Sequence, residues 1–164
     1  MKGNADFTME QQKRKPNRLK NYDYSRNGAY FITICVNDRT PILSHIDVGA
    51  NFVRLSRIGI VVENEIQKLS TVYENVFVDN YVIMPNHIHI IIRIESDNGR
   101  PQVAPTVSRI VKQFKGSITK QLQKSIWQKG FYDHIIRDEY DYQIKWQYID
   151  DNPVKWMEDN LYQN

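Results

Sequence analysis

Residues 87–95 constrain the fold more than any other part of this sequence, because their side chains alternate strictly along the chain. The four isoleucines at positions 88, 90, 92 and 94 point to one side of an extended backbone, and His87, His89, Ile91 and Arg93 point to the other. The segment therefore predicts a strand with a continuous isoleucine face toward a core and a histidine face on the other side.

Strand and helix patterns alternate along the rest of the chain. Strand-forming residues between turn signals predict four strands, over residues 29–36, 76–84, 87–95 and 132–136. Apolar residues at helical spacing predict three helices, over residues 56–72, 107–122 and 139–151. Asp138 is expected to cap the last helix and Pro153 to end it, and a loop is expected over residues 96–105.

This order of elements predicts an α+β fold. Strand, helix, strand, strand, helix, strand is the ferredoxin-like (RRM-like) arrangement, an antiparallel sheet with helices on one face, here with an added C-terminal helix. A chain of 164 residues with 41% hydrophobic residues is long enough for one domain with a buried core and short for two. We expect a basic N-terminal arm over residues 1–28 and a single domain over residues 29–164.

Basic residues cluster in two places. The formal net charge of +3 and the pI near 8.9 permit a polyanionic partner without requiring one. One cluster lies in the arm, and the other lies on the predicted helix over residues 107–122. The clusters consist of Lys13, Arg14, Lys15, Arg18 and Lys20, and of Arg109, Lys112, Lys115 and Lys120.

Several classes of protein are excluded or disfavoured. Cys35 is the single cysteine, so the chain can form no internal disulfide, no cysteine-based zinc cluster and no C-x-x-C redox motif. The first residues lack an apolar segment, and no apolar run is long enough to span a membrane. We expect a cytoplasmic protein with no membrane partner.

His87 and His89 are a candidate metal pair. Two residues apart on a strand, their imidazoles project from the same face, with Cα atoms about 6 to 7 Å apart at about 3.3 Å per residue. Two histidines on a half-buried sheet face can also be merely packed or solvated, and the spacing alone leaves both interpretations open. A third ligand has to come from elsewhere in the fold.

Tyr148 and Asn152 are four residues apart on the last helix, so a phenol and a carboxamide point the same way. The packing stripe of this helix is better described by Tyr142, Trp146 and Ile149, which leaves Tyr148 outside the stripe. The chain has 10 tyrosines, and spacing alone does not separate a nucleophile from an ordinary surface tyrosine.

Three segments together resemble one known family. They are Tyr81-Val-Ile-Met-Pro-Asn-His-Ile-His89, Trp127-Gln-Lys-Gly-Phe-Tyr-Asp-His-Ile-Ile-Arg137 and Tyr148-Ile-Asp-Asp-Asn-Pro-Val-Lys-Trp156. In this order they resemble the REP-associated tyrosine transposases, a branch of the single-tyrosine HUH insertion-sequence transposases. The resemblance covers about residues 13–157.

The resemblance implies roles for the candidate residues. His87 and His89 would be the HUH metal pair, Tyr148 the nucleophile that forms a 5′-phosphotyrosine intermediate, and Asn152 a third ligand to Mg²⁺ or Mn²⁺. The two basic clusters would hold a single-stranded DNA that carries a palindromic hairpin. Relatives exchange the nucleophile between subunits of a homodimer, so the resemblance leaves a monomer and a homodimer both open.

Two alternative enzyme classes do not fit this sequence. A histidine-triad hydrolase needs a third alternating histidine where this chain has Ile91, and a phosphoesterase with two H-x-[ST] motifs needs a Ser or Thr two residues after a histidine of the pair. Both fail. The remaining rival is a domesticated, non-cleaving hairpin DNA- or RNA-binding protein on the same fold. His134 is either a DNA-orienting group or a hydrogen-bonded structural histidine.

Overall fold

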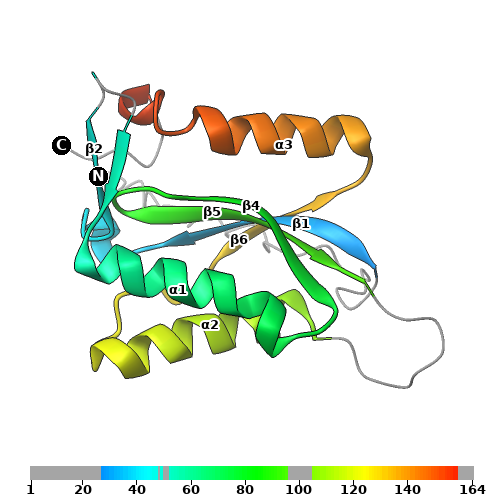
Figure 1. Cartoon of the computed structure of the whole chain (residues 1–164), viewed down its shortest axis with the longest axis horizontal. Coiled ribbons are helices and arrows are strands. Elements are labelled where there is room, and N and C mark those ends of the chain that lie inside the picture. The colour runs from blue at the N-terminus through cyan, green and yellow to red at the C-terminus, as the bar shows by residue number, and fades with distance from the viewer. Residues whose placement is uncertain (1–26, 48, 50–51, 96–104, 159–164) are drawn as a thin grey trace, which may run out of the picture.

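A four-stranded antiparallel sheet is the frame of the molecule (Figure 1). The computed structural model describes residues 27–47, 49, 52–95 and 105–158. The strands of the sheet are β1 (Gly28–Cys35), β4 (Val76–Ile83), β5 (His87–Ile94) and β6 (Tyr132–Ile136). Their order across the sheet is β4-β5-β1-β6, so the two long central strands β5 and β1 are each paired on both sides.

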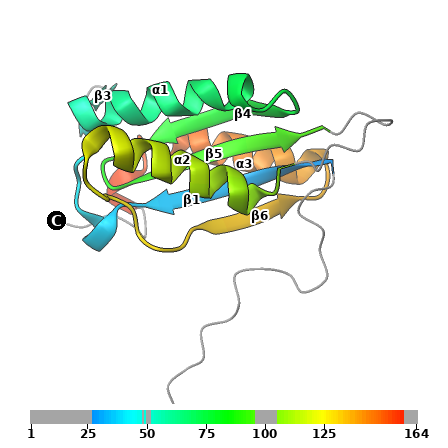
Figure 2. The same ribbon diagram turned by 90° about the horizontal axis from the view of Figure 1, so that it is seen from below.

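Three helices cover the sheet on its two faces. They are α1 (Arg57–Val72), α2 (Val107–Leu122) and α3 (Glu139–Asp151). Figures 1 and 2 show α1 and α2 side by side on one face and α3 alone on the other. The predicted ferredoxin-like order with an added C-terminal helix is confirmed, and each predicted strand and helix agrees with the observed one within two residues.

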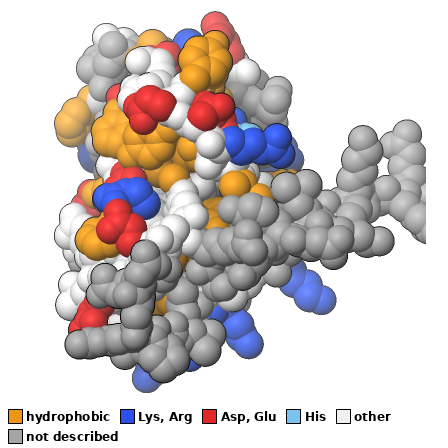
Figure 3. All heavy atoms as spheres, turned by 90° about the vertical axis from the view of Figure 1, so that its right-hand side faces the viewer, with side chains coloured by type: hydrophobic (Ala, Val, Ile, Leu, Met, Phe, Trp, Pro, Cys, Tyr) orange, Lys and Arg blue, Asp and Glu red, His pale blue; other side chains and the backbone are white. Residues whose placement is uncertain are grey.

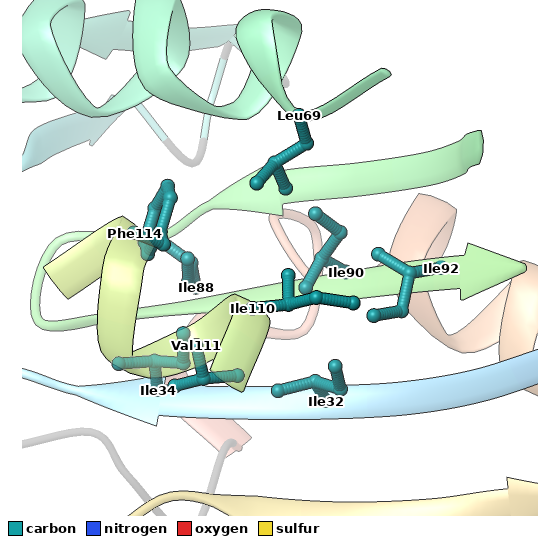
Figure 4. A pocket seen from close by; sticks show the side chains of 9 residues that line it. All are labelled: Ile32, Ile34, Leu69, Ile88, Ile90, Ile92, Ile110, Val111 and Phe114. Atoms are coloured by element: carbon teal, nitrogen blue, oxygen red, sulfur yellow. The ribbon is translucent and has the colours of Figure 1, made fainter. Parts of the chain in front are cut away.

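The isoleucine face of β5 lies in the main core, as predicted. Isoleucines 88, 90, 92 and 94 are all buried between the sheet and the two helices, together with alternate residues of β1. Figure 4 shows side chains of the sheet, α1 and α2 pointing toward one another; they are Ile32, Ile34, Leu69, Ile88, Ile90, Ile92, Ile110, Val111 and Phe114. All nine are apolar, so this interior space is part of the core and offers no polar group to a ligand.

Side-chain caps fix where the helices begin. The Ser56 hydroxyl accepts from the Gly59 N–H at 3.0 Å and begins α1, and Asp138 accepts from the Asp141 N–H at 2.8 Å and begins α3. The predicted cap at Asp138 is therefore confirmed. At its other end, α3 continues in helical geometry through Asn152, directly before Pro153.

The sequence analysis missed a second, two-stranded sheet. It consists of β2 (Ser44–Asp47) and β3 (Phe52–Leu55), each only four residues long. Ile46 is buried in a small cluster with Met84 and Trp156, so this hairpin packs on the turn before β5 and on the chain after α3. Two short 3₁₀ helices complete the described chain, at Asn37–Arg39 and Trp156–Glu158.

The histidine face of the sheet is also covered, by α3. Phe31, Ile91 and Ile149 form a second, smaller core there, against which Tyr142 and Trp146 pack. The predicted packing stripe of α3 is thus confirmed. Because α3 packs on this face, the side chains of His87 and His89 lie between the sheet and that helix.

Some expectations fall outside the described residues. The arm at residues 1–28 lies there except for residues 27 and 28, as does most of the loop predicted over residues 96–105. The division into an arm and one domain therefore stays a prediction. Within the described chain, no helix is long and apolar enough to cross a membrane.

Candidate active site

β5 brings His87 and His89 together at the turn end of the strand. Their Nε2 atoms lie 3.0 Å apart, and their rings meet edge to face with centroids 4.5 Å apart. Both side chains are buried, with exposed fractions of 0% and 3%. The two imidazoles therefore converge on one point, as the strand spacing predicts.

Each ring is held at its other nitrogen by a polar side chain. His87 Nδ1 donates to the Asn86 carboxamide oxygen at 2.7 Å, because that oxygen can only accept. His89 Nδ1 lies 2.8 Å from the hydroxyl of Thr33, its partner across the β1–β5 pair. A hydroxyl can donate or accept, so His89 can carry its proton on either nitrogen. The two rings can thus present both Nε2 lone pairs to one cation.

The environment keeps His89 uncharged. Burial lowers the pKa of His89 well below its ordinary value, and the nearby charges of His87 and Lys145 lower it further. A neutral imidazole is the form that ligates a metal ion, since the protonated form has no free lone pair. His89 is therefore in the ligating form at neutral pH.

Tyr148 lies beside the histidine pair of its own chain. Its ring centroid is 5.2 Å from that of His89 and 5.8 Å from that of Phe31, edge-on in both cases. Phe31 in turn stacks on His89 at 5.1 Å with nearly parallel planes. The Tyr148 side chain is 44% exposed, so one edge packs on the site while the rest faces solvent. A buried histidine pair and an accessible phenol thus meet at one place.

Asn152 lies buried between two residues that contact the histidines. It is four residues after Tyr148, which contacts His89, and four before Trp156, whose ring lies 5.8 Å from that of His87. Its side chain is 3% exposed, and its Oδ1 has no hydrogen-bond partner among the described residues. A buried amide oxygen left unpaired costs about 1–3 kcal/mol, so this atom is suited to an external ligand.

The residues present fit a divalent cation. Two nitrogens that each lie about 2.1 Å from one ion, at a right angle, are about 3 Å apart, which agrees with the spacing of the pair. In the described chain, no group of three or more His, Cys, Asp or Glu side chains could hold an ion, so a third ligand would have to be of another kind. The buried, unpaired Asn152 oxygen is a candidate for this ligand, and imidazole nitrogens and an amide oxygen are ligand types that Mn²⁺ or Mg²⁺ can take.

The predicted DNA-binding residues lie apart from this site. Lys13, Arg14, Lys15, Arg18 and Lys20 are outside the described residues. Arg109 and Lys112 are exposed on α2, which lies across the sheet from α3 (Figure 1). The Lys115 amine donates to the carbonyl oxygens of Gln128 and Gly130 at 2.8 and 2.6 Å, and burial lowers its pKa. It is thus already engaged in holding the chain before β6.

Charges of both signs are mixed at the end of the molecule seen in Figure 3. Arg93 on β5 pairs with Asp79 on β4 and with Glu95, the residue directly after β5. His134 on β6 lies 2.8 Å from the Asp141 carboxylate, which also accepts from the Arg137 N–H, and this fits the structural interpretation of the histidine. The contact between His134 and Asp141 joins the start of α3 to the sheet.

Sequence reasoning missed several residues of the site. Thr33 and Phe31 come from β1, some 56 positions before the histidines, and no spacing rule connects such distant segments. Lys145 lies just before the Tyr148 motif and Trp156 is its last residue, but their contacts with the site depend on how α3 crosses the sheet. Asn86, directly before His87, is the one such residue that a local signal could have pointed to.

Comparisons with known proteins agree with this geometry. No family model matches the chain. An uncharacterized protein of Haemophilus influenzae is 35% identical over 169 aligned positions, covering 91% of this chain and 93% of the relative. A second protein of that organism, named "Putative REP-associated tyrosine transposase", is 28% identical over 148 positions, covering 84% of this chain and 77% of the relative.

A solved structure shares the fold. A REP-associated tyrosine transposase bound to a REP hairpin overlays with a TM-score of 0.64 at 24% identity, covering 85% of this chain and 74% of the other. Relatives identified from sequence and from fold thus name the same kind of protein. The chain is therefore similar in sequence and in fold to the REP-associated tyrosine transposases.

Proposed function

We propose that this protein is a metal-dependent single-tyrosine transposase of the HUH class, which cleaves and rejoins single-stranded DNA next to palindromic hairpins. The observation that carries the proposal is the contact of Tyr148 with His89, 5.2 Å between ring centroids, where His89 itself lies 3.0 Å from His87. An accessible phenol beside a converging pair of imidazoles suits nucleophilic attack on a phosphodiester.

The reaction exchanges one phosphorus–oxygen bond for another. The Tyr148 oxygen attacks the phosphorus in line with the departing 3′-oxygen, so a tyrosine–phosphorus bond forms as the bond to the 3′-oxygen breaks. The phenol gives its proton to water, and the 3′-oxygen takes up a proton from water. The product is a 5′-phosphotyrosine adduct with a free 3′-hydroxyl. Another 3′-hydroxyl can reverse the step, so strands are joined without ATP.

The chain's own residues orient this chemistry. Asn86 and Thr33 hold the His87 and His89 rings, and α3 carries Asn152 and Tyr148 toward the pair. His87, His89 and Asn152 would hold the divalent ion, Mg²⁺ or Mn²⁺. When bound, such an ion polarises the phosphate and neutralises negative charge that develops there. Because Tyr148 contacts a histidine of its own chain, one subunit holds a complete set, which supports cleavage in cis rather than exchange within a homodimer.

The basic clusters would hold the DNA outside the cleavage site. The solved relative is bound to a REP hairpin, and we extend that substrate class to this chain. Arg109 and Lys112, exposed on α2, and the arm residues 13–20 suit contacts with the hairpin backbone. Lys115 would contribute mainly by fixing the chain before β6, since its amine is occupied by two carbonyl oxygens.

A labelled-adduct assay tests the proposal. The protein is incubated with labelled single-stranded DNA that carries a hairpin, with Mn²⁺ or Mg²⁺, and is then run on a denaturing gel. We expect a covalent adduct that is lost in Tyr148→Phe. Tyr140→Phe is the matched control, since Tyr140 lies on the same helix and is 78% exposed. Tight binding without an adduct on any hairpin would instead favour the non-cleaving binding protein.

A further inference from the structure

We propose that Lys145 is a further catalytic residue, whose ammonium group binds a non-bridging oxygen of the scissile phosphate while Tyr148 attacks. This inference rests on the proposed function and adds a residue to it. Three observations carry it: the place of Lys145 on α3, its contact with Phe31, and the lack of an ion pair between Lys145 and any carboxylate of the described chain.

Lys145 lies next to the nucleophile on the same side of α3. Lys145 is three positions before Tyr148, a spacing that makes side chains neighbours on a helix. The Lys145 Nζ lies 5.2 Å from the centre of the Phe31 ring. That ring also stacks on His89 at 5.1 Å and meets Tyr148 at 5.8 Å. One aromatic ring therefore contacts the amine, the nucleophile and a member of the histidine pair.

The ammonium group is available for an outside anion. In the part of the chain that the structure describes, Lys68, Arg93, His134 and Lys155 lie within ion-pair distance of carboxylates, whereas Lys145 does not. Asp141, one turn before Lys145 on α3, is the acid best placed to pair with it, and the charge of Lys145 acts on this carboxylate without an ion-pair contact. The Asp141 oxygens are instead bound by His134, at 3.0 and 2.8 Å, and by the Arg137 N–H at 3.2 Å.

An ammonium group near Tyr148 would stabilise the negative charge of the phosphate during the attack. As the phenol oxygen approaches phosphorus and the 3′-oxygen departs, negative charge persists on the non-bridging oxygens and develops on the leaving oxygen. A fixed ammonium group at a water-poor site stabilises that charge more than bulk water does. The metal ion would act from the histidine side and Lys145 from the Phe31 side. Two cations would then hold the phosphate in line with Tyr148.

The test compares neutral and charged replacements of Lys145 in the full-length protein. We expect Lys145→Met to slow adduct formation about 100-fold or more at saturating hairpin DNA, the loss typical when one donor to a charged transition state is removed. Lys145→Arg keeps the charge and is expected to retain a larger part of the rate. The matched control is Lys155→Met, which removes an exposed lysine paired with Asp151 and is expected to leave the rate unchanged.

Two further measurements separate this role from a structural one. On DNA with an uncharged methylphosphonate at the scissile position, the difference in rate between wild type and Lys145→Met should nearly vanish. Titration with Mn²⁺ without DNA should show that Lys145→Met binds the ion as tightly as wild type or more tightly, since a nearby positive charge is gone.

Three outcomes would overturn the proposal. A wild-type rate in Lys145→Met, an equal loss on the uncharged substrate, or a parallel loss of Mn²⁺ binding would each show that Lys145 does not bind the scissile phosphate. Lys145→Gln, measured in the same way, decides the question if the methionine variant does not fold. Failure of the wild type itself to form an adduct would instead overturn the proposed function, and this inference with it.

Discussion

At the scale of single residues, the site depends on polar side chains that hold the histidine rings from behind. Thr33 is buried at 7% exposure on β1, and its hydroxyl lies 2.8 Å from His89 Nδ1. Asn86 is 1% exposed and fixes His87 in the same way. Groups in this position orient metal ligands, and their loss typically weakens metal binding about 10- to 100-fold.

Thr33→Val tests this role directly. Valine keeps the volume of the side chain but removes the hydroxyl, so His89 Nδ1 loses its partner inside the protein. We expect the dissociation constant for Mn²⁺ to rise about 10-fold or more, measured by calorimetric titration. Thr33→Ser keeps the hydroxyl and should bind within a few-fold of wild type. Equal Mn²⁺ affinity in the valine variant would contradict the role.

How much of the site the sequence predicts differs from residue to residue. The shared face of His87 and His89 follows from strand periodicity, because that pattern is local. Tyr148 and Asn152 were singled out only by the family resemblance, since many surface tyrosines have the same spacing. Thr33 could not be predicted at all, because its place opposite His89 depends on the register between β1 and β5.

At the scale of elements, the long periodic helices and strands were predictable and the short hairpin was not. A helix of 16 residues such as α1 repeats its apolar pattern over four turns, which makes the pattern specific. β2 and β3 have four residues each, and each buries few side chains. Their place comes from contacts of Ile46 with Met84 and Trp156, which no local pattern contains.

The two helical glycines should respond oppositely to alanine. A Cβ atom on Gly59, in the first turn of α1, would overlap the carbonyl oxygen of Leu43 before the hairpin. A Cβ atom on Gly116, within α2, would meet nothing within 4 Å. We expect Gly116→Ala to raise the free energy of unfolding by up to about 1 kcal/mol and Gly59→Ala to lower it by about 1–3 kcal/mol. Urea unfolding measures both, and stabilisation by Gly59→Ala would contradict the close approach.

α3 is anchored near its start by a buried hydrogen bond. The Tyr142 hydroxyl donates to Asp79 at 3.0 Å, and Arg93 binds the same carboxylate at 3.1 Å. Burial and the hydrogen bond to Asp79 raise the pKa of Tyr142 to about 12. Below pH 10, the ordinary pKa of tyrosine, the folded state keeps the full benefit of this bond, and the benefit is lost as the pH rises toward 12.

Tyr142→Phe should therefore change both stability and its pH dependence. We expect the free energy of unfolding at pH 7 to fall by about 1–2 kcal/mol, the usual effect for a hydrogen bond to a charged group. Between pH 10 and 12, wild type should lose stability faster than the variant does. Urea unfolding at several pH values measures both effects, with Tyr140→Phe as the control. Parallel pH profiles would show that Tyr142 does not titrate in this way.

At the scale of the whole molecule, the sheet separates two cores of unequal size. The core against α1 and α2 contains 21 buried residues, whereas the core under α3 contains Phe31, Ile91 and Ile149. Regions with fewer buried apolar contacts open at lower free energy than the rest of a protein. The α3 layer should therefore be the part of the described chain that opens most easily.

Hydrogen exchange tests this difference. We expect the amides of α3 to exchange faster, at neutral pH and without denaturant, than those of β1 and β5 in the centre of the sheet. Ile149→Ala should speed exchange in α3 further, because Ile149 is 2% exposed in the smaller core. Exchange of α3 and β5 at equal rates would show that the two layers open as one unit.

The two faces of β5 also limit how this protein can change over evolutionary time. One residue gained or lost within β5 would turn every following side chain to the opposite face, so isoleucines would enter the site and histidines the core. Such a change would destroy stability and activity together. Lineages that lose the reaction but keep a folded protein should therefore arise by substitution at positions such as His87 or Tyr148, and the length of β5 should stay fixed even after cleavage is lost.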